Sequence, residues 1–302
     1  MKKRILALGL TVALAAASLA ACGGASTKTT EKKAEAGTEK SSEKATEAAK
    51  EEKADSGELR TYKLGVNGSD HEEWEKANEL LQKDNIKLEM VEFSDYVKPN
   101  EALEDGEIDL NAFQTEIYFN NFVKERGYTD LGILAYTQVA PMGIYSSKYK
   151  SLDEATGHLI IAIPNDVTNG GRALKFLEKN GFLTLKKEAG LTPTVMDIEK
   201  YNKDVEIVEM VATQIPASLP DLSFACINNG VAKDAGLTLK NDAIVYEDYK
   251  EPDMKNYWNI IAAKKDRIES EDFQKIKKAY NSDEVKQVIL EHYDGQSIPV
   301  WD

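Results

Sequence analysis

The chain has 302 residues, which is enough for one large domain or two ordinary ones. Its formal net charge is −14. This acidic excess excludes an electrostatic preference for nucleic acid or for an anionic lipid surface.

The first 22 residues resemble a secretory signal. A basic start at 2–4 precedes an apolar stretch from Ile5 to Leu19, which is too short and too rich in alanine to favour spanning a bilayer. Small residues surround Cys22, as in the bacterial lipobox, whose cysteine is lipidated and becomes the mature N-terminus. Because each buried CH₂ contributes about 0.8 kcal/mol, two or three acyl chains would anchor the protein durably. The alternatives are a transmembrane anchor and an ordinary signal with an incidental cysteine.

Residues 23–60 are mostly Lys, Glu, Ala, Ser and Thr, so they cannot bury enough apolar surface to fold and are predicted to be a flexible tether. Residues 61–302 hold 27 basic and 43 acidic residues, so the acidity belongs to the predicted folded part. If Cys22 carries lipid, Cys226 has no disulfide partner. Its apolar neighbours predict a small buried hydrophobe rather than a nucleophile.

From residue 61 onward, apolar residues alternate between strand-like and helix-like periodicity. This pattern predicts an α/β protein that opens on a β-α-β unit with a parallel strand pair. A body of 242 residues exceeds one comfortable core, so we expect two lobes with a ligand site between them. The predicted strands are 61–66, 86–93, 107–110, 158–163, 205–210, 222–227 and 258–263, with extended segments over 131–144. The predicted helices are 71–84, 99–104, 117–126, 171–180, 273–280 and 283–293.

Arg172 is the most informative single residue. With Thr168 or Asn169 as the N-cap of the helix at 171–180, Arg172 falls in the first turn, where a cation opposes the helix dipole. Its position therefore needs another reason, either a bound carboxylate held by the guanidinium fork or a structural Asp or Glu. The spacing leaves both open. Gly170 and Gly171 would let another group approach the backbone closely.

Two further segments follow predicted strands. Residues 111–114, with Tyr96 and Tyr118, could line an apolar pocket or could be core aromatics. The amides at 228–229 could bind a ligand's head group or cap the next helix.

We expect no catalysis, no metal and no cofactor. The histidines are scattered, and neither a nucleophile elbow nor a phosphate loop is present. His71 and His292 are predicted to be solvated surface residues, and the acidic pair Glu72–Glu73 is predicted to lie on a solvated helix face. Ser69 or Asp70 is expected to cap the helix that follows.

Five sequence blocks, in order, resemble the NlpA/MetQ family of methionine-binding lipoproteins over about residues 62–301. The blocks are 91–96 with 99–103, 105–114, 162–166 through 171–174, 193–198, and 227–228. The resemblance implies a two-lobed fold of the type II periplasmic-binding-protein kind that closes around a free amino acid. Lobe 1 would comprise 61–143 and a return at 256–302, and lobe 2 would comprise 144–255, with crossings near 141–145 and 253–259.

The resemblance also implies roles for individual residues. Arg172 matches the family's carboxylate-binding arginine, and Asn169 and Asn228 match the polar partners of the amino-acid head group. The positions that match the family's side-chain pocket are Tyr96, Phe113 and Tyr118. Two positions depart from the family pattern: Thr115 stands where a histidine is usual, and Ala217 stands where many relatives carry arginine.

The function that the resemblance implies is that of a monomeric solute-binding lipoprotein on the extracytoplasmic face of the cell membrane. It would bind methionine by closure of the lobes and deliver it to a membrane permease driven by an ATPase. Thr115 leaves open a methionine-containing dipeptide or another apolar amino acid as the ligand. A surface adhesion or interaction lipoprotein is the alternative of a different class.

Overall fold

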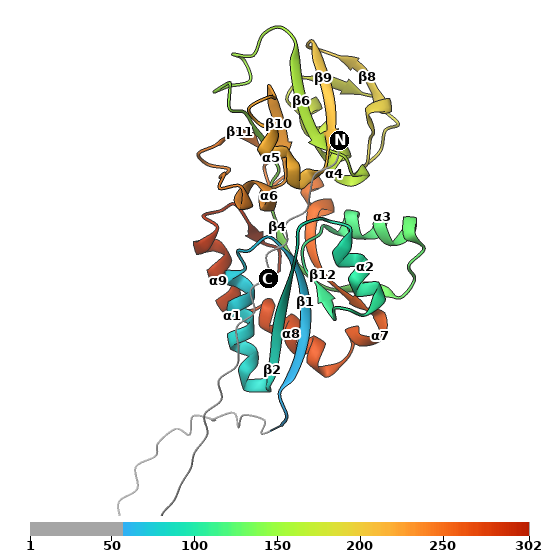
Figure 1. Ribbon diagram of the computed structural model, residues 1–302, viewed down its shortest axis with the longest axis vertical. Coiled ribbons are helices and arrows are strands. Elements are labelled where there is room, and N and C mark those ends of the chain that lie inside the picture. Colours follow the sequence, from blue (N-terminus) through green and yellow to red (C-terminus); the bar gives the residue numbers. More distant parts are fainter. Residues whose placement is uncertain (1–56, 302) are drawn as a thin grey trace, which may run out of the picture. The chain divides into compact units, whose positions relative to one another are not determined.

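The computed structural model describes residues 57–301, and the fold is built on two main β-sheets (Figure 1). The predicted signal segment, the lipidation site Cys22 and nearly all of the predicted tether lie outside these residues. Within 57–301, no helix combines the length and the apolar character that crossing a membrane requires.

The first lobe is defined here by a six-stranded mixed sheet with the order β13-β4-β12-β3-β1-β2. β1 pairs in parallel with β2, Arg60 opposite Ile86, which confirms the β-α-β unit predicted at the start of the folded part. The strands are β1 (Arg60–Asn67), β2 (Ile86–Phe93), β3 (Leu110–Asn111), β4 (Leu131–Val139), β12 (Trp258–Lys264) and β13 (Ile298–Pro299). The helices are α1 (Glu72–Leu81), η1 (Gln82–Asp84), α2 (Lys98–Asp105), α3 (Glu116–Arg126), α7 (Lys265–Ile268), α8 (Glu271–Tyr280) and α9 (Asp283–His292).

Helices cover both faces of this sheet. β12 shows why, since Ile261 and Ala263 pack with α1, α8 and α9, whereas Ile260 and Ala262 pack with α2 and α3. Successive side chains of a strand point to opposite faces, so a strand buried on both sides is a continuous apolar run.

The second lobe is defined by a five-stranded sheet with the order β11-β5-β10-β6-β9 and by a separate two-stranded β7-β8 ribbon. Its strands are β5 (Gly143–Tyr145), β6 (Leu159–Pro164), β7 (Leu183–Leu185), β8 (Ile198–Tyr201), β9 (Val205–Met210), β10 (Phe224–Ile227) and β11 (Ala243–Tyr246). Its helices are α4 (Val167–Lys179), η2 (Val195–Asp197), η3 (Ala212–Gln214), α5 (Ile215–Ser218) and α6 (Asn229–Asp234).

β10 divides the core of the second lobe in the same way. Phe224 and Cys226 pack in the cluster that includes α4, and Ala225 and Ile227 pack in the cluster that includes α5 and α6. Cys226 is fully buried, and burial raises the pKa of its thiol well above the ordinary value. The prediction that Cys226 is a buried hydrophobe rather than a nucleophile is therefore confirmed.

Two segments connect the lobes. One runs from the end of β4 at Val139 to the start of β5 at Gly143, and the other from the end of β11 at Tyr246 through η4 (Pro252–Tyr257) to β12. A backbone hydrogen bond of 3.0 Å from Glu247 to the Met142 carbonyl oxygen joins the two connections. The α/β architecture with two lobes is as predicted, and the exact lobe limits stay a prediction.

Several predicted element boundaries were wrong. α4 begins at Val167, not at 171, and its N-cap is Asp166, whose carboxylate accepts from the Asn169 backbone N–H at 2.8 Å. The N-cap of α1 is His71, which makes no side-chain capping bond. The predicted strand over 107–110 is reduced to β3 at its end.

The packing of β10 generates a test of core stability. Phe224 is fully buried between Tyr149 and Phe182, with ring centroids 5.3 and 5.6 Å away. Phe224→Ala should lower the free energy of unfolding by about 3–5 kcal/mol, measured by urea denaturation, because it leaves a cavity in a packed core. Met196→Ala, at a side chain that is 78% exposed, is the control and should change it by less than about 0.5 kcal/mol.

Candidate ligand-binding site

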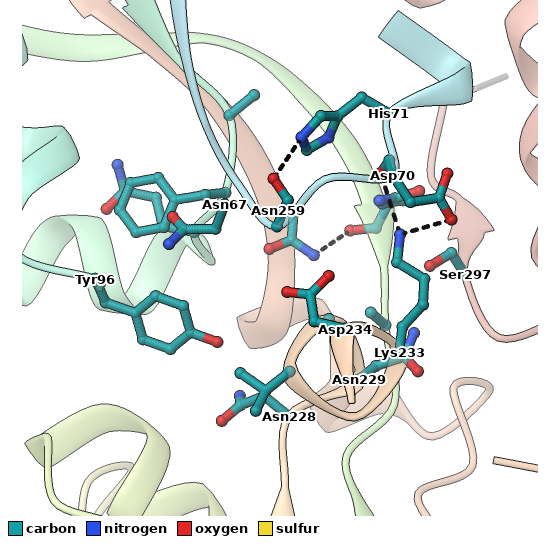
Figure 2. Close-up of a pocket in the computed structure, with 18 of the residues that line it drawn as sticks. Asn67, Asp70, His71, Tyr96, Asn228, Asn229, Lys233, Asp234, Asn259 and Ser297 are labelled. Atoms are coloured by element: carbon teal, nitrogen blue, oxygen red, sulfur yellow. Dashed lines mark hydrogen bonds and ion pairs between the residues drawn. The ribbon is translucent and has the colours of Figure 1, made fainter. Parts of the chain in front are cut away.

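A cavity of about 580 Å³ is lined by residues of both lobes (Figure 2). The first lobe contributes the β1–α1 loop, the β2–α2 loop and the segment after β3, and the second lobe contributes α4 and α6. Such a volume is in the range of small-molecule sites. All seven residues predicted to bind the ligand line this one cavity: Tyr96, Phe113, Thr115, Tyr118, Asn169, Arg172 and Asn228. Their roles toward a ligand stay a prediction.

One end of the cavity is aromatic. The rings of Tyr96, Phe113 and Tyr118 form a triangle with centroid separations of 5.9, 6.1 and 6.3 Å. The Tyr118 hydroxyl donates to the Tyr96 carbonyl oxygen at 2.9 Å, which fixes one ring against the other. Burial raises the pKa of both tyrosines, so their hydroxyls stay neutral. This end suits an apolar or thioether side chain, because sulfur makes favourable contacts with aromatic rings.

Residues beside this wall have a structural role. Gln114 exchanges hydrogen bonds of 2.7 Å with Asn100, and its amide also donates to Asn111 at 2.8 Å. All three amides are buried, and the network holds the turn after β3 in place. Thr115 caps α3 by accepting from the Tyr118 backbone N–H at 3.3 Å, in addition to lining the cavity. Ala217 is exposed on α5 and is not among the lining residues.

Arg172 lies in the second turn of α4, because the helix begins at Val167. The argument that a first-turn cation opposes the helix dipole was therefore wrong. Close packing explains why the two residues before Arg172 are glycines. A Cβ on Gly171 would lie 2.8 Å from the Thr192 Cα, and one on Gly170 would lie 2.7 Å from the Pro164 carbonyl oxygen.

The guanidinium of Arg172 is buried and paired with a protein carboxylate, Glu247. Nε donates to Glu247 Oε1 at 3.0 Å and Nη2 donates to Oε2 at 2.5 Å. Nη2 also donates to the Ala140 carbonyl oxygen at 2.9 Å, and Cζ lies 4.3 Å above the ring of Tyr257. Of the two explanations that the sequence left open, the structural carboxylate is present. These partners belong to both connections between the lobes, so Arg172 ties α4 to the hinge.

The other terminal nitrogen of Arg172 remains available. Within 57–301, no hydrogen bond is found for Nη1, and Arg172 is among the residues that line the cavity. A guanidinium can engage one carboxylate through Nε and Nη2 and still donate from Nη1 to a second one.

Amide side chains surround this position. Asn228 donates to Asn169 Oδ1 at 2.7 Å, and Asn169 donates in turn to the Asp166 carboxylate at 3.0 Å. Within the described residues, four buried amide oxygens along the cavity accept no hydrogen bond: those of Asn67, Gln138, Asn228 and Asn229. Buried acceptors are normally satisfied, so these oxygens indicate a place for a donor from water or ligand.

The opposite end of the cavity is charged, and the sequence did not predict it (Figure 2). Lys233 of α6 lies 3.4 Å from the carboxylate of Asp70 in the β1–α1 loop, and His292 lies 2.8 Å from the same carboxylate. These partners lower the pKa of Asp70, against the effect of burial. His71 and Glu73, predicted to be solvated, are 8% and 6% exposed.

Each of these two residues has a reason to be buried. His71 Nε2 contacts the Gly68 carbonyl oxygen at 2.8 Å. The hydroxyl of Tyr293 donates to Glu73, whose pKa burial raises. Helical spacing alone could not reveal the partner of Glu73, because Tyr293 lies 220 residues further along the chain.

The fold and the site together define a class of protein. Two α/β lobes joined by two connections, with a cavity lined by both, are the architecture of a two-lobed periplasmic-type binding protein. Residues 62–301 match the model of the NlpA lipoprotein family, and the chain belongs to that family.

Individual relatives agree with this assignment. The chain is 40% identical to the D-methionine-binding lipoprotein MetQ of Escherichia coli K12, over 79% of this chain and 88% of that one. A nutrient binding protein from Burkholderia cenocepacia bound to methionine matches with a TM-score of 0.75 at 35% identity, over 80% of this chain and 100% of that one. The substrate binding protein of a methionine transporter from Streptococcus pneumoniae matches with a TM-score of 0.75 at 38% identity, over 80% and 96% of the two chains.

The buried ion pair at the hinge generates a second test. Glu247→Gln keeps the shape of the side chain but leaves the Arg172 charge uncompensated, so the free energy of unfolding should fall by about 3 kcal/mol or more in chemical denaturation. Glu251→Gln is the matched control from the same connection, because its partner Lys179 is exposed and such pairs contribute about 0–1 kcal/mol. Equal effects of the two changes would contradict the structural role assigned to Glu247.

Proposed function

We propose that this chain is the solute-binding lipoprotein of an ABC importer and that it binds free methionine in the cavity between its lobes. The observation that carries the proposal is the position of Arg172, which lines a cavity with an aromatic wall and has no hydrogen bond at Nη1 within residues 57–301. Methionine is the cargo we favour because several relatives are named for binding it.

The carboxylate of the ligand would accept from Arg172 Nη1. Glu247 neutralises part of the guanidinium charge, but it also fixes the guanidinium plane, so little side-chain entropy is lost when a ligand binds. Asn169 and Asn228, which are already joined by a hydrogen bond, would complete the head-group contacts.

The thioether side chain would lie against Tyr96, Phe113 and Tyr118. These rings belong to the first lobe, whereas Arg172 belongs to the second. A ligand that contacts both lobes binds their closed arrangement better than an open one, and so shifts the population toward closure. The closed form is the signal that a permease can recognise.

The remaining parts of the proposal concern the cell surface. The family consists of lipoproteins, and Cys22 is the residue we propose to carry the lipid that holds the protein on the extracytoplasmic face of the membrane. We propose that a monomer delivers the ligand to a membrane permease with its ATPase, without covalent chemistry.

The Arg172 role can be tested with two ligands and one conservative change. Arg172→Lys keeps the positive charge but cannot reach two carboxylates at once, so calorimetry should show an affinity for methionine at least about tenfold lower. Methioninol lacks the carboxylate, so its affinity should change far less. Arg126→Lys, at a half-exposed arginine paired with Glu101, is the control and should leave both affinities unchanged.

The cargo itself can be identified directly. Mass spectrometry of the small molecules released when the purified protein is denatured should detect methionine. A different amino acid or a peptide would overturn the assignment of the cargo. If the released fraction is empty and calorimetry detects no methionine binding, the proposed function is wrong.

A further inference from the structure

Several buried acceptors along the cavity have no hydrogen-bond partner within the described residues. Four amide oxygens along it accept no hydrogen bond within residues 57–301, and one of them belongs to Asn229, which is only 6% exposed. Because unpaired buried acceptors are costly, each is expected to accept either from an ordered water or from an N–H group of an occupant. An ammonium group has three donors and no acceptor.

Most charges along the cavity are already neutralised. Arg172 is paired with Glu247, and Lys233 with Asp70, so neither cation leaves an excess of positive charge. Glu73 is buried and accepts from Tyr293. Among the carboxylates that line the cavity, Glu73, Glu92 and Asp234 form no ion pair in the part of the chain that the structure describes, and of these only Glu73 has a side-chain partner, Tyr293. This leaves Glu92 and Asp234.

Asp234 is the better placed of these two. Figure 2 shows its carboxylate among the side chains of Tyr96, Asn228 and Asn259. It lies so close to the β1–α1 loop that a Cβ on Gly68 would be 2.4 Å from Oδ1. Gly68 has a φ of +80°, a conformation that glycine adopts without strain. The loop therefore makes room for a carboxylate that reaches across from the other lobe.

Asp234 and Arg172 also act on a common group. Burial raises the pKa of the Tyr96 hydroxyl most, the charges of Asp166 and Asp234 raise it further, and the charge of Arg172 lowers it. An anionic and a cationic side chain along the same cavity suit a zwitterion, whose ammonium and carboxylate groups are attached to the same carbon.

We propose that the Asp234 carboxylate accepts the ammonium group of the ligand and thereby makes the cavity selective for a cationic nitrogen. The inference rests on the proposed function, because it takes the ligand to be a free amino acid. The ammonium would also donate to the unpaired oxygen of Asn228.

The raised pKa of Asp234 agrees with a role in binding a cation. Desolvation raises the pKa of its carboxyl group, while Lys233, His71 and the Ser69 backbone lower it and Asp70 raises it. Compared with the unfolded chain, the folded, ligand-free protein thus disfavours the ionised form of this carboxylate. A folded-state pKa above the unfolded value means that stability falls as pH rises between the two values and stays lower above them.

The test uses methionine and 4-(methylthio)butanoate, which keeps the thioether and the carboxylate but lacks the ammonium. In calorimetry at pH 7.5, Asp234→Asn should lower the affinity for methionine about tenfold or more, and should leave the affinity for 4-(methylthio)butanoate within about twofold. Asp221→Asn is the control, because Asp221 is an exposed residue of the second lobe that does not line the cavity, so that both affinities should be unchanged.

A thermal measurement separates binding from folding. Asp234→Asn should slightly raise the Tm of the ligand-free protein at pH 7.5, since it removes a disfavoured charge, and should reduce the Tm increase that methionine produces.

Each of the remaining outcomes would contradict the inference, and each has a different meaning. An equal loss for both ligands would mean that Asp234 acts on closure rather than on the ammonium. An unchanged affinity for methionine, or a selective loss in Glu92→Gln instead, would place the ammonium elsewhere. If the wild-type protein binds neither ligand, the proposed function fails, and the inference fails with it.

Discussion

The ion pair between Arg172 and Glu247 is the interaction on which the rest of the structure depends. It joins α4 of the second lobe to the two connections between the lobes, because the guanidinium also contacts Ala140 and Tyr257. A buried pair of this kind contributes little net stability, since desolvation offsets most of the attraction, but removing one partner is costly. Its main effect is therefore to fix geometry, and it does so where the hinge and the cavity meet.

This geometry would allow a buried arginine to serve the hinge and a ligand at once. The edge of the guanidinium formed by Nε and Nη2 donates to Glu247, and within residues 57–301 no hydrogen bond is found for Nη1. A ligand that contacts Nη1 would thus be connected through one rigid group to both segments that must move during closure. Contact with the hinge and contact with the ligand do not compete in such an arrangement. Arg172 therefore has a structural role, its pairing with Glu247. Its contact with a ligand carboxylate is the proposal that the binding experiment tests.

The two ends of the cavity differ in how their chemistry arises. The aromatic end is local in sequence, because Tyr96, Phe113 and Tyr118 come from neighbouring turns of one lobe. The charged end is assembled from distant segments, with Lys233 and Asp234 reaching from α6 toward Asp70 and the β1–α1 loop. Movement of the lobes would therefore change the charged end far more than the aromatic end. The contacts of the ligand's polar groups, rather than those of its side chain, would therefore change most when the lobes close.

The sequence by itself determined the alternation of strands and helices, the two-lobed α/β class and the burial of Cys226, because these follow from apolar periodicity that each segment carries on its own. It also determined the residues that line the aromatic end, through sequence blocks shared with a family. Only the tertiary structure decided the helix start at Val167, the partner of Arg172 and the burial of His71 and Glu73. The helix start at Val167 depends on a local hydrogen bond, from the Asn169 backbone N–H to the Asp166 carboxylate, and several neighbouring residues could have formed such a cap. The partners of Arg172 and Glu73 are residues far apart in the chain, Glu247 and Tyr293, and no local pattern of spacing or propensity records such a contact.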